Sequence, residues 1–224
     1  MSNQVISLMQ TKGGAGKSTT LATIATHMAS DGAKIAIVDT DPNKDTYDFC
    51  KATKYDFKFA FIDNPNEIKP AISQLKKTGY DAIFFDTAGA DSTLNTYVIA
   101  NSDLVIIPAK CNKSDATKAV ATYRRVMAAC DNFNKTIETR LLLVDVDHDT
   151  RMTNSILSAL IKADMPLLNT KVGHATGFKE LTSNGSIPKS GAAKNHINSL
   201  MCELQMKNLL DFYNKPQLKN VSEA

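Results

Sequence analysis

A cluster of glycines, lysines and hydroxyl residues near the start of the chain has the composition of a phosphate-binding loop. The segment runs Lys12-Gly13-Gly14-Ala15-Gly16-Lys17-Ser18-Thr19. Glycines allow the backbone to curl so that its N–H groups point inward at phosphate oxygens. We expect Lys17 to reach the β- and γ-phosphates of a nucleotide and the Ser18 hydroxyl to bind Mg²⁺. Thr11 stands where the common pattern G-x-x-x-x-G-K-[ST] requires glycine, but the variant K-G-G-x-G-K-[ST]-T matches at every position.

The residues on either side of this loop predict the strand and the helix that a phosphate loop needs. Val5-Ile6-Ser7-Leu8-Met9 predicts a short buried strand. After the loop, apolar residues follow at helical spacing: Leu21, Ile24, Ala25 and Met28. The positive end of a helix that begins near Lys17 would add to the field at the phosphates. This order of strand, loop and helix favours phosphate binding over an idle glycine-rich turn.

Acidic residues end two further predicted strands. The first of these strands is Lys34-Ile35-Ala36-Ile37-Val38, and it is followed by Asp39-Thr40-Asp41-Pro42. The second is Asp81-Ala82-Ile83-Phe84-Phe85-Asp86, whose last residue is acidic. Because ligands bind at the carboxyl ends of strands in open parallel sheets, we expect these carboxylates beside the phosphate loop. The second strand has the Walker B pattern, which would place Asp86 beside the Mg²⁺ on Ser18. The next residues, Thr87-Ala88-Gly89, are small, so we expect a loop that approaches the γ-phosphate and moves when the phosphate leaves.

Together these motifs resemble the ParA/MinD family of deviant Walker ATPases. In that family a lysine at the position of Lys12 crosses a dimer interface and touches the ATP of the partner subunit, so the resemblance implies a homodimer that closes over two nucleotides. The D-x-D-P segment is similar to the second ATPase motif of the family, although Asn43 stands where the family often has Gln. By that resemblance Asp41 orients the attacking water and Asp39 supports the magnesium shell.

The resemblance therefore implies ATP hydrolysis with ATP and Mg²⁺ as cofactors, and it assigns three sets of residues. The catalytic set is Lys12, Lys17 and Asp41. The ATP-binding set is Gly13, Gly14, Ala15, Gly16, Lys17, Ser18 and Thr19. The magnesium set is Ser18, Asp39 and Asp86.

The rest of the chain predicts alternating strands and helices. Further strands are expected at residues 57–61, 104–108, 140–144 and 166–171. Further helices are expected at residues 45–54, 65–78, 116–129, 152–162 and 192–213. With no repeat or linker, residues 1–214 predict one P-loop NTPase domain of the α/β class, a mostly parallel twisted sheet of about seven to eight strands with helices on both faces. Residues 215–224 predict a polar tail.

Two later segments are also similar to ParA proteins, and a third leaves base recognition open. Asp115 stands seven residues after Pro108, and residues 183–188 resemble the family's loop before its final helix. The acidic run at residues 145–149 is interpreted as a loop near the nucleotide base plus an N-cap for the next helix, rather than a metal cluster. The family often has Asn or Arg here for the base, and this chain has Asp145.

Composition limits the class of protein. The chain has no run of 18 apolar residues, no secretory signal at Met1-Ser2-Asn3-Gln4 and four scattered cysteines, which favours a cytoplasmic protein without a zinc or iron–sulfur site. The net charge is +3, and residues 165–224 carry seven lysines against four acids. This asymmetry suggests a surface that faces a polyanion as readily as it suggests ordinary solvated lysines. The DNA-binding candidates are Lys171, Lys179, Lys189 and Lys194.

The resemblance is strongest to short ParA proteins such as ParF of plasmid partition systems. It implies an ATP-dependent dimer that binds DNA non-specifically on the nucleoid and hydrolyses ATP when a ParB-like partner or adaptor stimulates it. Two alternatives stay open, a conjugation-linked ATPase of the VirC1 kind and a membrane-associated positioning ATPase of the MinD kind. The MinD kind needs a basic amphipathic C-terminal helix, and the tail at 215–224 has a proline and no aromatic residue.

Overall fold

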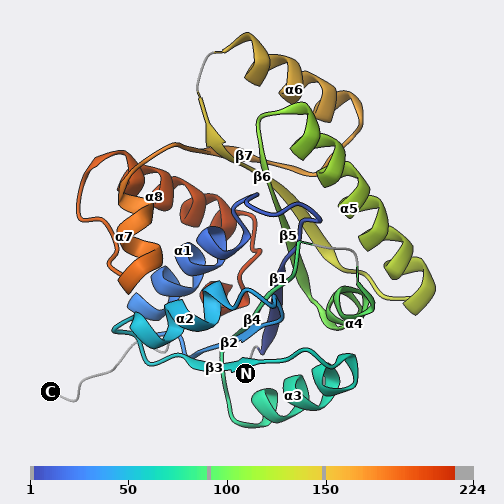
Figure 1. Ribbon diagram of the computed structural model, residues 1–224, viewed down its shortest axis with the longest axis vertical. Coiled ribbons are helices and arrows are strands. Elements are labelled where there is room, and N and C mark those ends of the chain that lie inside the picture. Colours follow the sequence, from blue (N-terminus) through green and yellow to red (C-terminus); the bar gives the residue numbers. More distant parts are fainter. Residues whose placement is uncertain (1–2, 90–91, 148–149, 215–224) are drawn as a thin grey trace, which may run out of the picture.

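Seven parallel strands form one twisted sheet at the centre of the molecule (Figure 1). The computed structural model describes residues 3–89, 92–147 and 150–214. The strands are β1 (Gln4–Leu8), β2 (Ile35–Asp39), β3 (Lys58–Phe61), β4 (Ala82–Asp86), β5 (Leu104–Lys110), β6 (Glu138–Val146) and β7 (Leu167–Gly173). Their order across the sheet is β3-β2-β4-β1-β5-β6-β7. The predicted α/β sheet with helices on both faces is therefore confirmed, and its strands number seven.

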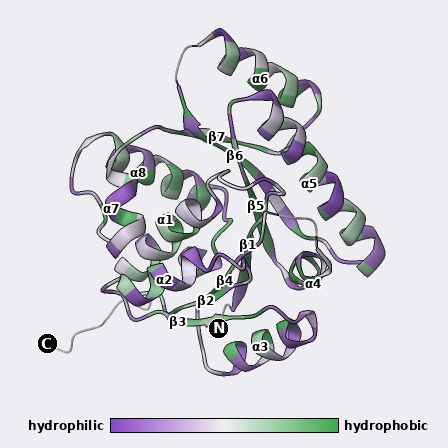
Figure 2. Cartoon of the chain, in the orientation of Figure 1, coloured by the Kyte–Doolittle hydropathy of each residue, from purple (hydrophilic) through white to green (hydrophobic). Residues whose placement is uncertain are grey.

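Helices cover both faces of this sheet. One face packs against α1 (Lys17–Ser30), α2 (Asp45–Ala52), α7 (Gly177–Asn184) and α8 (Gly191–Met206). The other packs against α3 (Pro65–Lys77), α4 (Thr93–Asn101), α5 (Lys113–Phe133) and α6 (Arg151–Lys162). The central strands are apolar, as Figure 2 shows, because both faces of the sheet are buried under helices. No helix in the described part of the chain is long and apolar enough to span a membrane.

The strand register brings the predicted acidic residues to one edge of the sheet. Asp86 is the register partner of Leu8 on β1 and of Asp39 on β2. The loops after β1, β2 and β4 therefore leave the sheet side by side, at its carboxyl edge. This arrangement follows from parallel pairing, which gathers all strand ends of one polarity at the same edge.

Three helical segments differ from the sequence prediction. Helix α4 was not predicted, and α5 extends beyond the expected 116–129 at both ends. Asn112 caps its start, its side chain accepting the Asp115 N–H at 3.0 Å, and the left-handed Asn134 ends it. The final helix ends at Met206 instead of reaching Tyr213. Asn208 takes the left-handed conformation with φ 54°, and a short 3₁₀ turn, η1 (Asp211–Asn214), follows. The left-handed residue breaks the helical path, so the apolar residues beyond it belong to a separate turn.

The N-cap of α6 is also different from the prediction. Thr150 caps this helix, its side-chain oxygen accepting the Thr153 N–H at 3.1 Å. His148 and Asp149 of the acidic run, and the predicted tail at 215–224, lie outside the described residues.

Candidate nucleotide site

The glycine-rich loop connects β1 to α1 in the predicted order, and α1 begins at Lys17. Gly14 has φ 71° and Gly16 has φ 93°, conformations that favour glycine. A Cβ added at Gly13 or Gly14 would meet no atom within 4 Å, so the loop backbone borders open space. The first turn of a 14-residue helix and the glycine-rich loop before it have the geometry of an anion-binding end.

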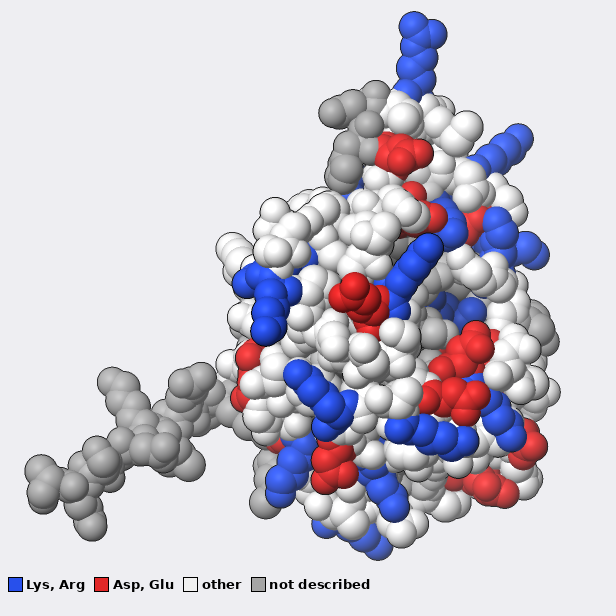
Figure 3. All heavy atoms as spheres, turned by 60° about the vertical axis from the view of Figure 1, so that its left-hand side comes forward, with Lys and Arg blue, Asp and Glu red and all other residues white. Residues whose placement is uncertain are grey.

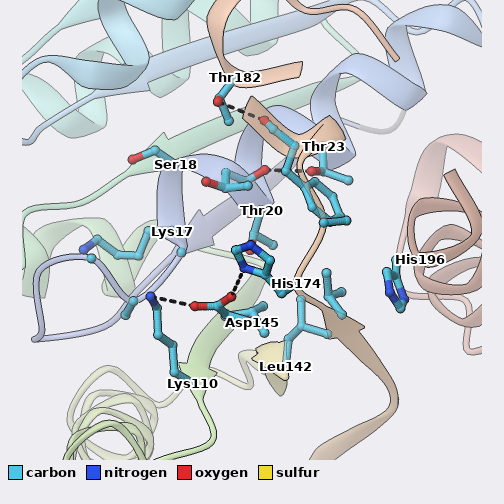
Figure 4. A pocket seen from close by; sticks show the side chains of 18 of the residues that line it. Lys17, Ser18, Thr20, Thr23, Lys110, Leu142, Asp145, His174, Thr182 and His196 are labelled. Carbon is cyan, nitrogen blue, oxygen red and sulfur yellow. Dashed lines mark hydrogen bonds and ion pairs between the residues drawn. The ribbon is translucent and has the colours of Figure 1, made fainter. Parts of the chain in front are cut away.

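This open space is a cavity of about 420 Å³ that reaches from the loop to α7 and α8. Its lining includes the whole predicted ATP-binding set from Gly13 to Thr19, together with Asp41. Figure 4 shows Lys17 and Ser18 at one end of this cavity. Lys17 is almost fully buried, which places its charge in a low-dielectric setting where attraction to an anion is strong.

The Asp86 carboxylate lies beside the loop and receives two hydroxyl hydrogen bonds. Ser18 Oγ donates to Asp86 Oδ2 at 2.6 Å, and Thr46 Oγ1 donates to the same oxygen at 2.5 Å. The other oxygen, Oδ1, is buried and has no hydrogen-bond partner among the described residues. Burial raises the pKa of Asp86 to about 6, although the hydrogen bonds from Ser18 and Thr46 act to lower it. Sequence analysis identified Asp86 and Ser18 but missed Thr46.

Asp39 and Asp41 occupy different environments. Both oxygens of the buried Asp39 accept backbone hydrogen bonds at 2.9 Å, from the N–H groups of Asp41 and Tyr47. Burial raises the pKa of Asp39 in spite of these two bonds. Asp41 is half-buried and lines the cavity, with one oxygen accepting the Asn43 N–H at 3.0 Å. Asp39 thus holds the D-T-D-P loop in shape, while Asp41 is the carboxylate that faces the cavity.

Lys12 does not line the cavity. Its ammonium group forms an ion pair with Asp115 in the first turn of α5. The Lys12 side chain is 38% exposed and that of Asp115 only 1%. Within one chain, therefore, Lys12 is directed to Asp115 on α5 and not into its own cavity. The contact of Lys12 with the ATP of a partner subunit stays a prediction.

The loop after β4 packs closely on the phosphate loop. A Cβ added at Gly89 would lie 2.9 Å from the backbone nitrogen of Gly13, a clash that only glycine avoids. Further along, Asn95 Nδ2 donates to the Ala88 carbonyl at 3.3 Å, and Arg125 Nη2 donates to the Ser92 carbonyl at 2.7 Å. The first contact connects the small-residue loop to α4, and the second connects the N-cap of α4 to α5.

A charged trio, Lys110, Asp145 and His174, also lines the cavity, and Figure 4 shows it from close by. Asp145 has φ 54° at the end of β6 and pairs with Lys110 at 2.9 Å and with His174 at 2.7 Å. The hydrogen bonds from Lys110 and His174 hold the pKa of Asp145 below its usual range. The prediction that Asp145 lies near the nucleotide space agrees with this position. Lys110 and His174 were not predicted, because only folding brings the ends of β5 and β7 to this aspartate.

The four lysines predicted to contact DNA are spread over several elements. They lie on β7, on α7, in the loop before α8 and on α8: Lys171, Lys179, Lys189 and Lys194. Lys179 lines the nucleotide cavity, and Lys194 Nζ donates to the Lys189 carbonyl at 3.0 Å. On the side of the molecule drawn in Figure 3, basic and acidic side chains are interspersed. Their role in DNA binding stays a prediction.

The residues beside the loop fit a magnesium ion. The donor set of a hydroxyl, a carboxylate and nucleotide phosphates is the kind that Mg²⁺ prefers, usually with one or two protein carboxylates. Asp86 Oδ1 is a buried oxygen without a partner in the described structure, which is the state expected of an atom left for a metal or its water. No cluster of three or more His, Cys, Asp or Glu that could bind a metal is found among residues 3–89, 92–147 and 150–214.

Comparison with known proteins assigns the chain to a family. The family model described as VirC1 protein matches residues 3–209. The chain belongs to the VirC1 family. Another member with sequence similarity is the virC1 protein of Rhizobium rhizogenes, 27% identical over 189 residues that cover 79% of each chain. The VirC1 kind, one of the alternatives considered from sequence, is thus supported by a matching family model.

This VirC1-family chain is also similar to partition proteins. The ParA protein of Rhizobium radiobacter is 23% identical over 185 residues, which cover 81% of this chain and 83% of ParA. The solved structure of a plasmid partition protein from Borrelia burgdorferi B31, bound to AMPPNP, matches with a TM-score of 0.66 and 20% identity, covering 92% of this chain and 100% of that one. The resemblance to ParA/MinD proteins that the motifs predicted is therefore confirmed, and the fold is that of a P-loop NTPase.

Proposed function

We propose that this chain is an ATP hydrolase that works as a nucleotide-dependent switch. The observation that carries the proposal is the phosphate loop, which borders a cavity of about 420 Å³. Ser18 of this loop lines the cavity and donates a hydrogen bond to the buried carboxylate of Asp86. Membership of the VirC1 family and the similarity to a ParA protein support it. Such a switch has ATP and Mg²⁺ as its cofactors.

In this proposal each residue acts by position and charge. The loop N–H groups and Lys17 bind the phosphates, where their fixed dipoles and charge stabilise the negative charge that develops in phosphoryl transfer. Asp41, which lines the cavity, accepts a hydrogen bond from the attacking water and aligns it. Ser18 and Asp86 would hold Mg²⁺, which when bound neutralises charge on the phosphate oxygens. Asp39 keeps the D-T-D-P loop in register, and a direct part in the magnesium shell remains a prediction for it.

The switch acts as a homodimer. Lys12 lies outside the cavity of its own chain. In the dimer, Lys12 of one subunit therefore acts on the ATP that is bound to the other subunit. We further propose that the ATP-bound dimer binds DNA without sequence preference at the nucleoid, and that a ParB-like or adaptor partner stimulates hydrolysis. These steps serve the segregation of a plasmid or other cargo.

Hydrolysis and binding assays test this function. Wild-type protein should release phosphate from ATP slowly in the presence of Mg²⁺, with a specific rate that rises with protein concentration as dimers form. Lys17→Ala should lose nucleotide binding, because it removes the buried cation of the loop. Asp41→Ala should bind ATP and stay dimeric in gel filtration but lose hydrolysis by about 10²–10⁴-fold, the usual contribution of a positioned acid–base group.

The matched control is Asp48→Ala, an exposed aspartate on the neighbouring helix α2. It should hydrolyse ATP like the wild type. An Asp41→Ala protein with normal turnover would reassign the water-activating role, with Asp39 as the first alternative. A wild-type protein that binds no nucleotide would end the proposal.

A further inference from the structure

Thr46 makes a contact that the proposed mechanism has not yet used. It lies in the first turn of α2, its side chain is buried, and its hydroxyl donates to Asp86 Oδ2 at 2.5 Å. Ser18 donates to the same oxygen at 2.6 Å. Two donors on Oδ2 fix the rotation of the carboxylate and leave Oδ1 as its oxygen without a partner among the described residues.

The backbone of α2 holds this hydroxyl firmly. The N–H of the next residue, Tyr47, donates to Asp39 Oδ2 at 2.9 Å. Asp39 and Asp86 are register partners on the adjacent strands β2 and β4. Two successive residues of one helical turn thus bind the two carboxylates that end these strands, so the position of Thr46 is fixed by the sheet itself.

Ser18 and Thr46 differ in their access to the nucleotide. Ser18 lines the cavity, where its oxygen is a candidate metal ligand, whereas Thr46 is not part of the cavity lining. Thr46 can therefore act on a metal only through Asp86. Its donated hydrogen bond keeps Asp86 oriented while the oxygen of Ser18 is engaged elsewhere.

We propose that Thr46 is a positioning residue for magnesium, because its hydroxyl holds Asp86 so that Oδ1 stays available to Mg²⁺ or to a water on it. This inference rests on the proposed ATPase function. Partners of metal ligands that contact no metal themselves commonly contribute about 10–100-fold to metal affinity. The alternative is that Thr46 only satisfies a buried carboxylate as part of the folded core.

The test is the magnesium dependence of nucleotide binding, measured with a fluorescent ATP analogue. In Thr46→Val, which keeps the shape but removes the hydroxyl, the Mg²⁺ concentration for half-maximal binding should rise about 10–100-fold. Binding measured in EDTA should be unchanged. Thr46→Ser should restore the wild-type dependence, because it keeps the donor. If Thr46→Val lowers the melting temperature too far for the assay, Thr46→Ala carries the same comparison.

The matched control is Thr26→Val on α1, since Thr26 is also fully buried but its hydroxyl has no partner in the described structure. It should leave the magnesium dependence unchanged. Wild-type magnesium dependence in Thr46→Val, or a Thr46→Ser protein as impaired as Thr46→Val, would overturn the positioning role and leave the ATPase proposal intact. A wild-type protein that binds no nucleotide would instead end the ATPase proposal, and this inference with it.

Discussion

Lys12 has a structural contact in addition to its proposed catalytic role, namely an ion pair with Asp115. Asp115 is almost fully buried, and in the single chain its carboxylate is paired with the Lys12 ammonium group. Removing Lys12 leaves a buried carboxylate without its cation, which is costly to the folded state. A catalytic role across a dimer interface would be lost by the same substitution, so stability and turnover must be measured separately.

We predict that Lys12→Ala lowers the free energy of unfolding by about 1–3 kcal/mol, the usual cost of leaving a buried polar group unsatisfied. It should also lose ATP hydrolysis while keeping nucleotide binding. Adding Asp115→Asn should recover most of the stability, because the buried charge is gone, but none of the hydrolysis. Urea unfolding and phosphate release measure the two effects. Recovery of hydrolysis in the double variant would show that Lys12 acts only through folding.

At the scale of helices and strands, long apolar runs were the best guide. The runs in β2, β4 and β5 predicted strands correctly, because strands buried on both faces are continuously apolar. Helix α4 was missed since its sequence, Thr93–Asn101, has no apolar stripe, and it packs between α3 and α5. The end of α8 was misjudged because Leu209 and Phe212 continue the helical spacing. The Lys207-Asn208 pair was the available signal, since Asn is common in the left-handed conformation that ends helices.

The site shows the same division between local and tertiary information. The phosphate loop, Asp41 and Asp86 follow from motifs in continuous sequence, and the cavity lining and the Ser18–Asp86 bond agree with them. Thr46, Lys110 and His174 reach the site only through packing of separate elements. Nothing in the sequence spacing indicates the contacts of Lys110 and His174. For Thr46 the available signal is its place in the first helical turn after D-x-D-P.

Glu203 attaches α8 to the edge strand β7. Its two carboxylate oxygens accept the backbone N–H groups of Asn169 at 2.7 Å and Thr170 at 2.6 Å. Burial acts to raise the pKa of Glu203, but these hydrogen bonds outweigh it and hold the pKa below its ordinary value of 4.5. A carboxylate is needed because both partners are donors, and an amide would turn its NH₂ group toward one of them.

We predict that Glu203→Gln lowers the free energy of unfolding by about 1–3 kcal/mol at pH 7. Because the folded pKa is depressed, the wild type has this stabilisation above pH 4.5 and loses it as the pH falls through the folded pKa. The difference between wild type and variant should therefore shrink as the pH is lowered from 6 to about 3 in urea unfolding. Glu180→Gln, an exposed position on α7, is the control and should show no such difference. A gap that is constant with pH would contradict the ionised role.

At the scale of the whole molecule, the single chain has a net charge of only +3, and its basic side chains are interspersed with acidic ones on the side drawn in Figure 3. On this side, a surface that attracts DNA strongly would have to be assembled from two subunits. Of the candidate lysines, Lys179 lines the nucleotide cavity, so changing it would confuse DNA binding with ATP binding. Lys189, in the loop before α8, and Lys194, on α8, are the better pair to test, because neither lines that cavity.

We predict that duplex DNA binding requires ATP and Mg²⁺, ignores sequence and weakens steeply with salt, because each neutralised phosphate releases counterions. In the dimer, both lysines of each subunit would contact phosphates. Lys189→Glu/Lys194→Glu should therefore make the slope of log affinity against log salt less steep, by about 0.9 for each lost contact. Nucleotide binding should not change.

The control is Lys69→Glu/Lys77→Glu on α3, which alters the net charge equally on the opposite face of the sheet. Equal losses in both variants would mean that overall charge, not this surface, attracts DNA. If the wild type shows no binding to long duplex DNA at low salt with ATP and Mg²⁺, the partition mechanism fails, and a switch that acts on a protein scaffold becomes the better account.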